Sequence, residues 1–151
     1  MTEPMGQVRR ATQGDLDAVL NLDQRNPVGH ERSELLSARV RSGECLLFER
    51  EGKPVGYLIM RSRGFFGRDF IELLVVAAQE RRTGIASRLL HEALSQSLTR
   101  ETFTSTNESN VAMIALLHKR DWRFSGQLEG IDEGDPEFVF YKRAARAAIR
   151  P

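Results

Sequence analysis

The chain has 151 residues, of which 40% are hydrophobic, and a net charge of +1. This length suits one domain with a buried core, and the near-neutral charge argues against nucleic acid as the main partner. The apolar runs are too short to cross a bilayer, and the first ten residues lack the apolar segment of a secretion signal.

Hydrophobic spacing predicts alternating strands and helices along the whole chain, without repeats or low-complexity linkers. Side chains at Thr12 and Asp15 can cap the first helix, and Gly43 can end the second. In chain order we expect a strand at 7–12, a helix carrying Leu16, Val19 and Leu20, a helix at 31–42, strands at 45–51, 54–62 and 69–76, a helix at 84–98, a strand at 101–107, a helix at 110–120, and strands at 122–130 and 137–143. The segment 63–68 is expected to be a turn. This order indicates a single mixed α/β domain over residues 1–151.

The segment 79–87, Gln-Glu-Arg-Arg-Thr-Gly-Ile-Ala-Ser, stands where an apolar strand gives way to an amphipathic helix. Arg81 and Arg82 oppose the partial positive charge of the helix N-terminus, at a cost of a few tenths of a kcal/mol. A bound anion would offset that cost, because the unpaired N–H groups of a helix N-terminus bind phosphate. Gly84 and Ala86 are small enough to let a pyrophosphate reach the backbone. The segment therefore predicts a phosphate-binding loop, with a plain solvated turn as the alternative.

Two common phosphate loops do not fit this chain. A P-loop needs Gly-Lys-Ser/Thr, but Gly52-Lys53 is followed by Pro54, and no Gly-x-Gly is present for a dinucleotide fingerprint. The remaining pattern, Arg81-x-x-Gly84-x-Ala86 between strand and helix, resembles the acyl-coenzyme A-binding segment of the GNAT N-acetyltransferase superfamily.

The resemblance extends over nearly the whole chain and implies a GNAT-like fold: a mixed, mostly antiparallel, twisted sheet of about seven strands flanked by about four helices. It implies acetyl-CoA as the cosubstrate, with the strand 70–76 splayed from the strand 101–106 to admit the pantetheine arm. The implied cofactor-binding residues are Leu74, Val76, Arg81, Arg82, Thr83, Gly84, Ile85, Ala86, Ser87 and Asn110.

A second family signature, Asn-x-x-Ala-x-x-Leu-Tyr-x-x-x-Gly-Phe, is partly present from Asn110 onward. Met113 stands where alanine is usual, and Asp121-Trp122 replaces Gly-Phe. Leu117 occupies the position at which many members carry a tyrosine that protonates the leaving coenzyme A thiolate. Leucine cannot donate a proton, so the group that fills this role stays open. His118 is one helical step away and is expected to point elsewhere, as a surface residue.

Glu72 is the candidate catalytic residue. It lies in the apolar strand that leads into the loop, on the strand face shared by Phe70, Leu74 and Val76. A carboxylate buried there would be costly unless it were paired. It is either a structural partner of an arginine or a base, with a pKa raised by desolvation, that removes a proton from an incoming amine.

The acceptor site is less clearly marked. In the family it lies between the first two helices and the loop before the last strand, here 23–32 and 129–137. The second segment carries five acidic residues that could attract a cationic amine or form a solvated turn. His30 could border the cleft or lie in a surface loop. Phe65 and Phe66 could add an apolar lip or cap the core.

Cysteine and histidine give no further chemistry. The single cysteine, Cys45, is expected to be a small core or surface thiol rather than a nucleophile, without a disulfide partner in the chain. The three histidines lack the spacing of metal ligands, and His91 falls on the polar side of its helix, so we expect no metal.

The sequence thus predicts an enzyme that transfers an acetyl group from acetyl-CoA to a primary amine by direct attack in a ternary complex. The alternative is a non-catalytic acyl-CoA-binding or regulatory module of the same fold. The acceptor is expected to be a small molecule or a peptide amine, with no role for nucleic acid or membrane. We expect a cytoplasmic protein that is a monomer or a homodimer.

Overall fold

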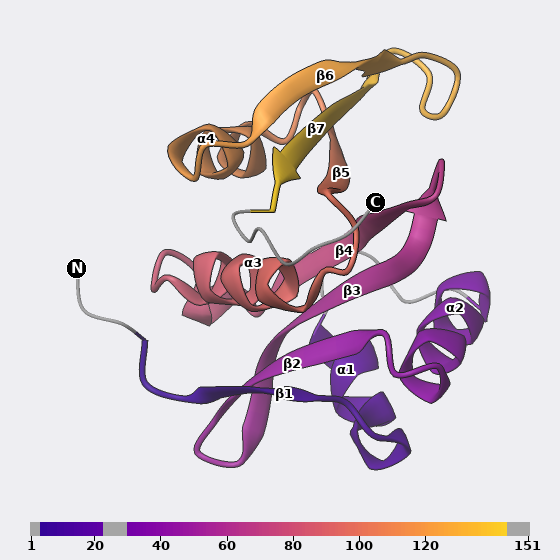
Figure 1. Ribbon diagram of the computed structural model, residues 1–151. Helices are drawn as coiled ribbons and strands as arrows, with labels where there is room; N and C mark the ends of the chain where they lie inside the picture. The colour runs from indigo at the N-terminus through magenta and orange to yellow at the C-terminus, as the bar shows by residue number, and fades with distance from the viewer. Residues whose placement is uncertain (1–3, 23–29, 145–151) are drawn as a thin grey trace. The chain divides into compact units, whose positions relative to one another are not determined.

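The computed structural model describes residues 4–22 and 30–144. Within them the chain alternates strands and helices in the expected order (Figure 1). The elements are β1 (Gln7–Arg10), a 3-10 turn (Gln13–Asp15), α1 (Leu16–Leu22), α2 (His30–Arg41), β2 (Cys45–Arg50), β3 (Lys53–Phe65), β4 (Arg68–Val76), a 3-10 turn (Ala78–Glu80), α3 (Ile85–Gln96), β5 (Glu101–Asn107), α4 (Val111–Lys119), β6 (Arg123–Leu128) and β7 (Glu137–Arg143). None of the helices described is long and apolar enough to span a membrane.

The strands follow the order β1-β2-β3-β4-β5-β7-β6 in one sheet. Antiparallel pairing joins β1 to β2, β2 to β3, β5 to β7 and β6 to β7, whereas β4 and β5 are parallel. Seven strands, mostly antiparallel, with four α-helices confirm the predicted mixed α/β fold.

The chain forms two compact units. The first contains the residues up to Met60 together with Leu73–Ala93, and the second contains Arg61–Glu72 together with the residues from Leu94 onward. The strands β3 and β4 and the helix α3 therefore contribute to both. The expectation of a single domain over 1–151 stays a prediction.

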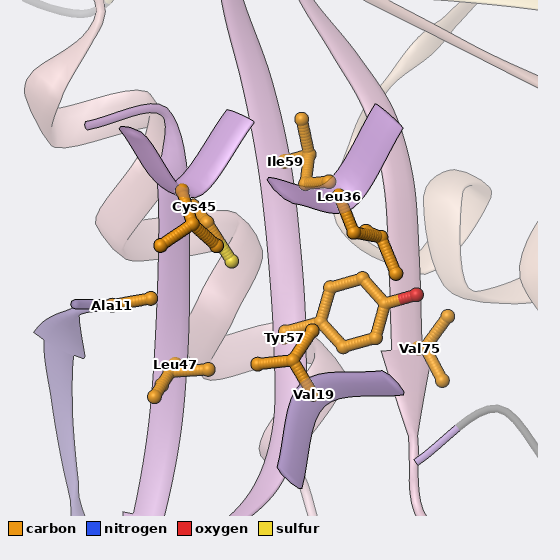
Figure 2. Packing of buried hydrophobic residues seen from close by; sticks show 9 residues of the cluster. Ala11, Val19, Leu36, Cys45, Leu47, Tyr57, Ile59 and Val75 are labelled. Atoms are coloured by element: carbon orange, nitrogen blue, oxygen red, sulfur yellow. The ribbon is translucent and has the colours of Figure 1, made fainter. Parts of the chain in front are cut away.

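In the first unit, α1 and α2 contribute to an apolar core with β2, β3 and the end of β4 (Figure 2). Alternation along β2 and β3 turns Cys45, Leu47, Tyr57 and Ile59 to this side. The buried cluster consists of Ala11, Val19, Leu36, Val40, Cys45, Leu47, Tyr57, Ile59 and Val75. Burial of this apolar surface fixes the end of β4, the strand that leads into the predicted loop.

The helix α3 packs against β3 at Gly56. A Cβ atom at this position would lie 3.1 Å from Ile85 Cγ2 and 3.5 Å from Leu89 Cδ1. Ile85 and Leu89 are both buried, and they belong to the face of α3 that the sequence predicts as apolar. The close approach holds the first turn of α3 in place.

In the second unit a buried carboxylate joins three segments. Asp69, 3% exposed, accepts from the backbone N–H of Arg63 through Oδ1, at 3.0 Å. Its Oδ2 accepts from Ser97 Oγ and from the backbone N–H of Leu98, each at 2.9 Å. These bonds draw the chain away from helical geometry after Gln96. The prediction that the helix continues to 98 with Leu98 on its apolar face is therefore wrong, and Leu98 is 70% exposed.

The turn predicted at 63–68 is shorter than expected. Strand pairing continues to Phe65 and resumes at Arg68, so only Phe66 and Gly67 turn the chain, with φ angles of 50° and 77°. Two left-handed residues in succession are the signature of a tight hairpin turn. Phe65 stacks on Phe70 with ring centroids 5.2 Å apart, whereas Phe66 is 89% exposed.

Candidate functional site

The loop between β4 and α3 is held by its own hydrogen bonds. The hydroxyl of Thr83 donates to the carbonyl of Glu80 at 2.6 Å, and the carboxylate of Glu80 pairs with Arg50 of β2. Arg81 Nε donates to the carbonyl of Val76 at 3.3 Å. These contacts fix the path from the end of β4 to the start of α3 before any ligand binds.

Backbone geometry in this loop requires residues that tolerate positive φ. Gly84 has φ of 90°, which suits glycine, and Arg82 has φ of 64°. The N–H of Arg88 donates to the carbonyl of Gly84 at 3.0 Å, so Gly84 is the residue that caps the helix. The N–H groups at the very start of α3 precede its first complete turn and so lack the i−4 helical acceptor that later residues have. The loop presents backbone donors at a helix N-terminus, which is the arrangement that binds phosphate.

Side chains around the helix start differ in exposure, and Pro4 lies close to Gly84, with its Cδ atom 3.5 Å from where a Cβ atom of residue 84 would be. Arg81 and Arg82 are exposed, and Thr83, Ala86 and Ser87 are half-buried. Ile85 is buried and anchors the helix. Leu74 and Val76, half-buried in β4, precede the loop in the same unit. The first unit thus contains all the predicted cofactor-binding residues except Asn110.

Pairing between β4 and β5 is short. It covers only Asp69–Ile71 with Thr102–Thr104, although β5 pairs with β7 along all seven of its residues. The hydroxyl of Thr104 donates to the carbonyl of Ile71 at 3.0 Å, at the last of these pairs. Leu74 and Val76 lie beyond the paired part of β4. The splay of the two strands stays a prediction.

The remaining predicted site residues belong to the second unit. Glu72 is half-buried in β4, one residue beyond Ile71. Asn110 caps α4, because its Oδ1 accepts from the backbone N–H of Met113 at 3.3 Å. Its contact with a cofactor stays a prediction. Leu117 is completely buried, so it acts as a core residue of α4.

Cys45 is a core thiol, whereas His91 and His118 are exposed, as the sequence suggests. Cys45 is completely buried, and desolvation raises the pKa of its thiol to about 12, which keeps it protonated. His91 is exposed, and so is His118, whose ring meets Phe140 edge-on at 5.6 Å. Among the residues described, no group of three or more potential ligands could hold a metal ion.

Part of the predicted acceptor region can be placed. In the acidic segment 129–137, Asp132 accepts from Asn107 Nδ2 at 2.8 Å, and Asp135 accepts from Ser109 Oγ at 2.6 Å. These two carboxylates therefore hold the loop together. The residues 23–29 and the side chain of His30 lie outside what the structure describes.

Sequence reasoning missed two features of the second unit. One is the buried Asp69, whose partners lie 28 to 30 residues further along the chain at Ser97, Leu98 and Thr99. The other is Arg61, whose Nε atom is buried without a hydrogen-bond partner in the described structure. An aspartate within a hydrophobic strand pattern is a weak signal of the first, and no local pattern indicates the second.

Comparison with known proteins gives a consistent family. Residues 15–122 match the profile of the acetyltransferase (GNAT) family. A GNAT-family acetyltransferase from Bacillus cereus ATCC 10987 is 34% identical, covers 94% of this chain and 99% of its own, and superposes with a TM-score of 0.87. No curated protein sequence gives a significant match.

Two more distant structures share the fold. The yncA protein of Salmonella typhimurium, solved with its cofactor acetyl-CoA, is 18% identical over 97% of this chain and 98% of its own, with a TM-score of 0.75. The ribosomal-protein-S18-alanine N-acetyltransferase of Escherichia coli is 15% identical over 97% of this chain and 99% of its own, with a TM-score of 0.77. The family profile covers more than half of the sequence, and the Bacillus cereus protein matches nearly all of it. The chain therefore belongs to the GNAT family of acetyltransferases.

Proposed function

We propose that this protein transfers the acetyl group of acetyl-CoA to a primary amine by direct attack in a ternary complex. The observation that carries the proposal is the loop before α3, where left-handed backbone at Arg82 and Gly84 leads directly into a helix N-terminus. This loop belongs to a chain of the GNAT family. The acceptor is a small molecule or a peptide amine, and the protein works in the cytoplasm as a monomer or homodimer.

The first unit supplies the cofactor contacts in this proposal. Backbone N–H groups of 82–87 bind the pyrophosphate, and the charge of Arg81 or Arg82 offsets that of the phosphates. Peptide groups near Leu74 and Val76, beyond the part of β4 that pairs with β5, form hydrogen bonds with the amides of the pantetheine arm. Fixed donors and strand edges of this kind orient the thioester for attack.

Glu72 is the base of the proposed reaction. An amine attacks the thioester carbonyl only as the free base, so a proton must leave it directly or through a water molecule. Glu72 is a carboxylate in the strand that provides the cofactor contacts, and it is half-buried. The amine nitrogen forms the new amide bond as the carbon–sulfur bond breaks, and the coenzyme A thiolate leaves.

Leu117 supports the alternative, a non-catalytic acyl-CoA-binding or regulatory module. Its side chain is completely buried and carries no proton that could pass to the thiolate. In the catalytic proposal, water or another side chain protonates the thiolate. The pKa of a thiol is only about 8.5, so a thiolate can also leave without a protein donor near neutral pH.

Turnover separates the two candidates. Purified protein is incubated with acetyl-CoA and a panel of primary amines: free amino acids, amino-acid amides, polyamines and short peptides. Free thiol release and acetylated product are measured against a blank without acceptor. Product with at least one amine supports the enzyme. Saturable acetyl-CoA binding without product from any amine supports the binding module.

A further inference from the structure

Residues 4–6, here called the N-terminal strap, precede β1 and reach the loop before α3 (Figure 1). A Cβ atom at Gly84 would lie 3.5 Å from Cδ and 3.9 Å from Cγ of Pro4. Apart from the chain neighbours of Gly84, Pro4 is the only described residue within 4 Å of that point. The strap and the loop belong to the first unit, so their contact lies within it.

The contact leaves no space for a phosphate on that side of Gly84. A carbon–carbon bond is about 1.5 Å long, so the Cα of Gly84 and the Cδ of Pro4 are at most about 5 Å apart. A phosphate oxygen between these two atoms would need about 3.5 Å to each of them, which is about 7 Å in all. The ring of Pro4 therefore occupies the side of Gly84 from which the side chain is missing.

The path of the strap depends on Gly6. This residue has φ of 139°, and a Cβ atom here would lie 2.5 Å from the carbonyl oxygen of Glu49 and 2.6 Å from Phe48 Cε1. Only a residue without a side chain passes this close to β2. The strap therefore leaves β1 along a defined course rather than as a free end.

Arg50 of β2 holds the strap in this position. Its Nε donates to the carbonyl of Met5 at 3.0 Å, and its guanidinium also pairs with the carboxylate of Glu80 in the loop. Neither this ion pair nor the bond from Thr83 to the carbonyl of Glu80 involves the strap. The loop can therefore keep its shape when the strap moves away.

Opening of the strap requires little free energy. The strap lies outside the pairing of β1 with β2, which begins at Gln7, and Met5 is 83% exposed. Segments that bury so little surface open locally at small cost. A proline ring also brings no negative charge to the helix N-terminus, so a phosphate is the stronger ligand for the donors there.

We propose that the strap is an autoinhibitory contact, in which Pro4 occupies the place beside Gly84 that the pyrophosphate of coenzyme A needs. This inference rests on the proposed binding of acetyl-CoA at the loop before α3. The cofactor binds only those molecules whose strap is open, so its apparent Kd equals the intrinsic Kd divided by the open fraction. A strap that closes over bound cofactor is the opposite arrangement, and the short contact at Gly84 disfavours it.

The test compares coenzyme A binding by four full-length proteins: the wild type, Pro4→Gly, Pro4→Ala and Met5→Ala. Both substitutions of Pro4 remove the two ring atoms that contact Gly84, and glycine also loosens the backbone of the strap. Met5→Ala is the matched control, because Met5 is exposed and contacts Arg50 through its carbonyl group. Isothermal titration gives the Kd, and stopped flow with coenzyme A that carries a fluorophore on its thiol gives the two rate constants. Melting temperatures verify that each variant is folded.

We expect Pro4→Gly to lower the Kd by about threefold to tenfold, which corresponds to a strap closed in about two thirds to nine tenths of free molecules. The association rate constant should rise by the same factor, with an unchanged dissociation rate constant, because the strap competes only for the empty loop. Pro4→Ala should show a smaller gain in the same direction. Met5→Ala should match the wild type.

Three results would overturn the inference while leaving cofactor binding intact. Unchanged affinity in both Pro4 variants would show that the ring does not obstruct the loop. Weaker affinity with faster dissociation would make the strap a cover over bound cofactor. An equal gain in Met5→Ala would show that the effect does not depend on the ring of Pro4. Absence of coenzyme A binding in all four proteins would instead contradict the proposed function itself, and the inference with it.

Discussion

Glu72 lies one residue past the last pair that β4 makes with β5. If it is the base, Glu72→Gln keeps size and shape but removes the proton acceptor. We expect kcat near neutral pH to fall by roughly 10²–10⁴, with acetyl-CoA affinity almost unchanged. The acidic limb of the pH–rate profile should also change, because the variant no longer has a carboxylate base at this position.

If Glu72 has only a structural role, the opposite result is expected for Glu72→Gln. A carboxylate that only stabilises the fold would leave the rate and the pH profile intact in Glu72→Gln, and the melting temperature would drop. Steady-state kinetics from pH 6 to 9 beside a thermal melt separate the two. A stable variant with wild-type kcat/KM across this range would assign the base to another group.

Single residues were predictable where their role depends on local pattern. The exposure of His91 and His118 follows from their place in a helix period. The strand pattern left open whether Cys45 is a core or a surface thiol, and the structure shows it buried. The environments of Asp69 and Arg61 were not predictable. Asp69 acquires its partners from a connection 28 residues away, and Arg61 is distinguished by a partner that is missing. Neither the distant partners of Asp69 nor the missing partner of Arg61 can be predicted from the residues next to them in the sequence.

At the scale of the element, α4 ends in a tight cap that explains a departure from the family signature. The N–H of Trp122 donates to the carbonyl of Leu117 at 2.9 Å, and the N–H of Asp121 donates to that of His118 at 3.1 Å. This pair of bonds forms a Schellman motif, whose left-handed residue is usually glycine. Here it is Asp121, with φ of 64°. The family pattern has glycine at this position.

Asp121→Gly should therefore stabilise the protein. Glycine adopts left-handed backbone without the steric cost that a Cβ atom imposes, so we expect a gain of about 0.5–1 kcal/mol and a melting temperature higher by about 2–4 °C. Asp121→Ala is the control and should lower the melting temperature, since alanine has the Cβ atom without the polar side chain. An unchanged or lower melting temperature for the glycine variant would show that the aspartate side chain outweighs the backbone cost.

The loop before α3 gives a prediction about ligand binding. Gly84→Glu places a negative charge beside the proposed pyrophosphate, so saturating acetyl-CoA should no longer raise its melting temperature. For the wild type we expect a stabilisation of about 2.7 kcal/mol at a ligand concentration a hundred times the Kd.

Gly84→Ala separates charge from backbone strain. Because φ is 90° at this position, alanine should lower the melting temperature of the free protein, yet leave most of the ligand-induced shift. Equal shifts in the wild type and in Gly84→Glu would refute the assignment of this loop to the cofactor. Isothermal titration with coenzyme A provides an independent measure of the same affinities.

Element types were predictable because hydrophobic period and capping residues are local. Thr12 and Asp15 form the expected cap, with Asp15 Oδ2 accepting from the N–H of Thr12 at 2.8 Å. The end of α3 was not predictable, because the bonds of Ser97 and Leu98 to Asp69 compete with another helical turn. The spacing of the leucines by itself predicts a helix that continues to residue 98.

At the scale of the whole molecule, the order of elements was predictable but the order of strands was not. The last strand, β7, lies between β5 and β6. The short connection between β6 and β7 is compatible with a hairpin. The alternation of hydrophobic residues does not show that β7 also pairs with β5 along seven residues. Only the family resemblance implied that arrangement, through the fold as a whole.

Acid stability is a property of the whole molecule that one ionic cluster controls. Arg9 donates to both carboxylate oxygens of Asp15, each at 2.8 Å, and also to Glu49 at 3.1 Å. Its guanidinium holds the pKa of Asp15 well below its usual range and lowers the pKa of Glu49. The folded state thus favours the ionised carboxylates more than the unfolded state does.

The sign of the pH dependence follows from that difference. A carboxylate whose pKa is lowered by folding stabilises the protein fully above its unfolded pKa, 3.8 for Asp15, and loses this contribution as the pH falls toward the folded value. The melting temperature should therefore fall between about pH 5 and pH 3.

Arg9→Met should lower the melting temperature at pH 7, by an amount that corresponds to about 1–2 kcal/mol, and should reduce the fall in melting temperature at acid pH. Arg10→Met, a neighbouring exposed arginine, should leave both nearly unchanged. Thermal melts at pH 3, 4, 5 and 7 measure the difference, and parallel acid falls in Arg9→Met and the wild type would place the acid-sensitive group elsewhere.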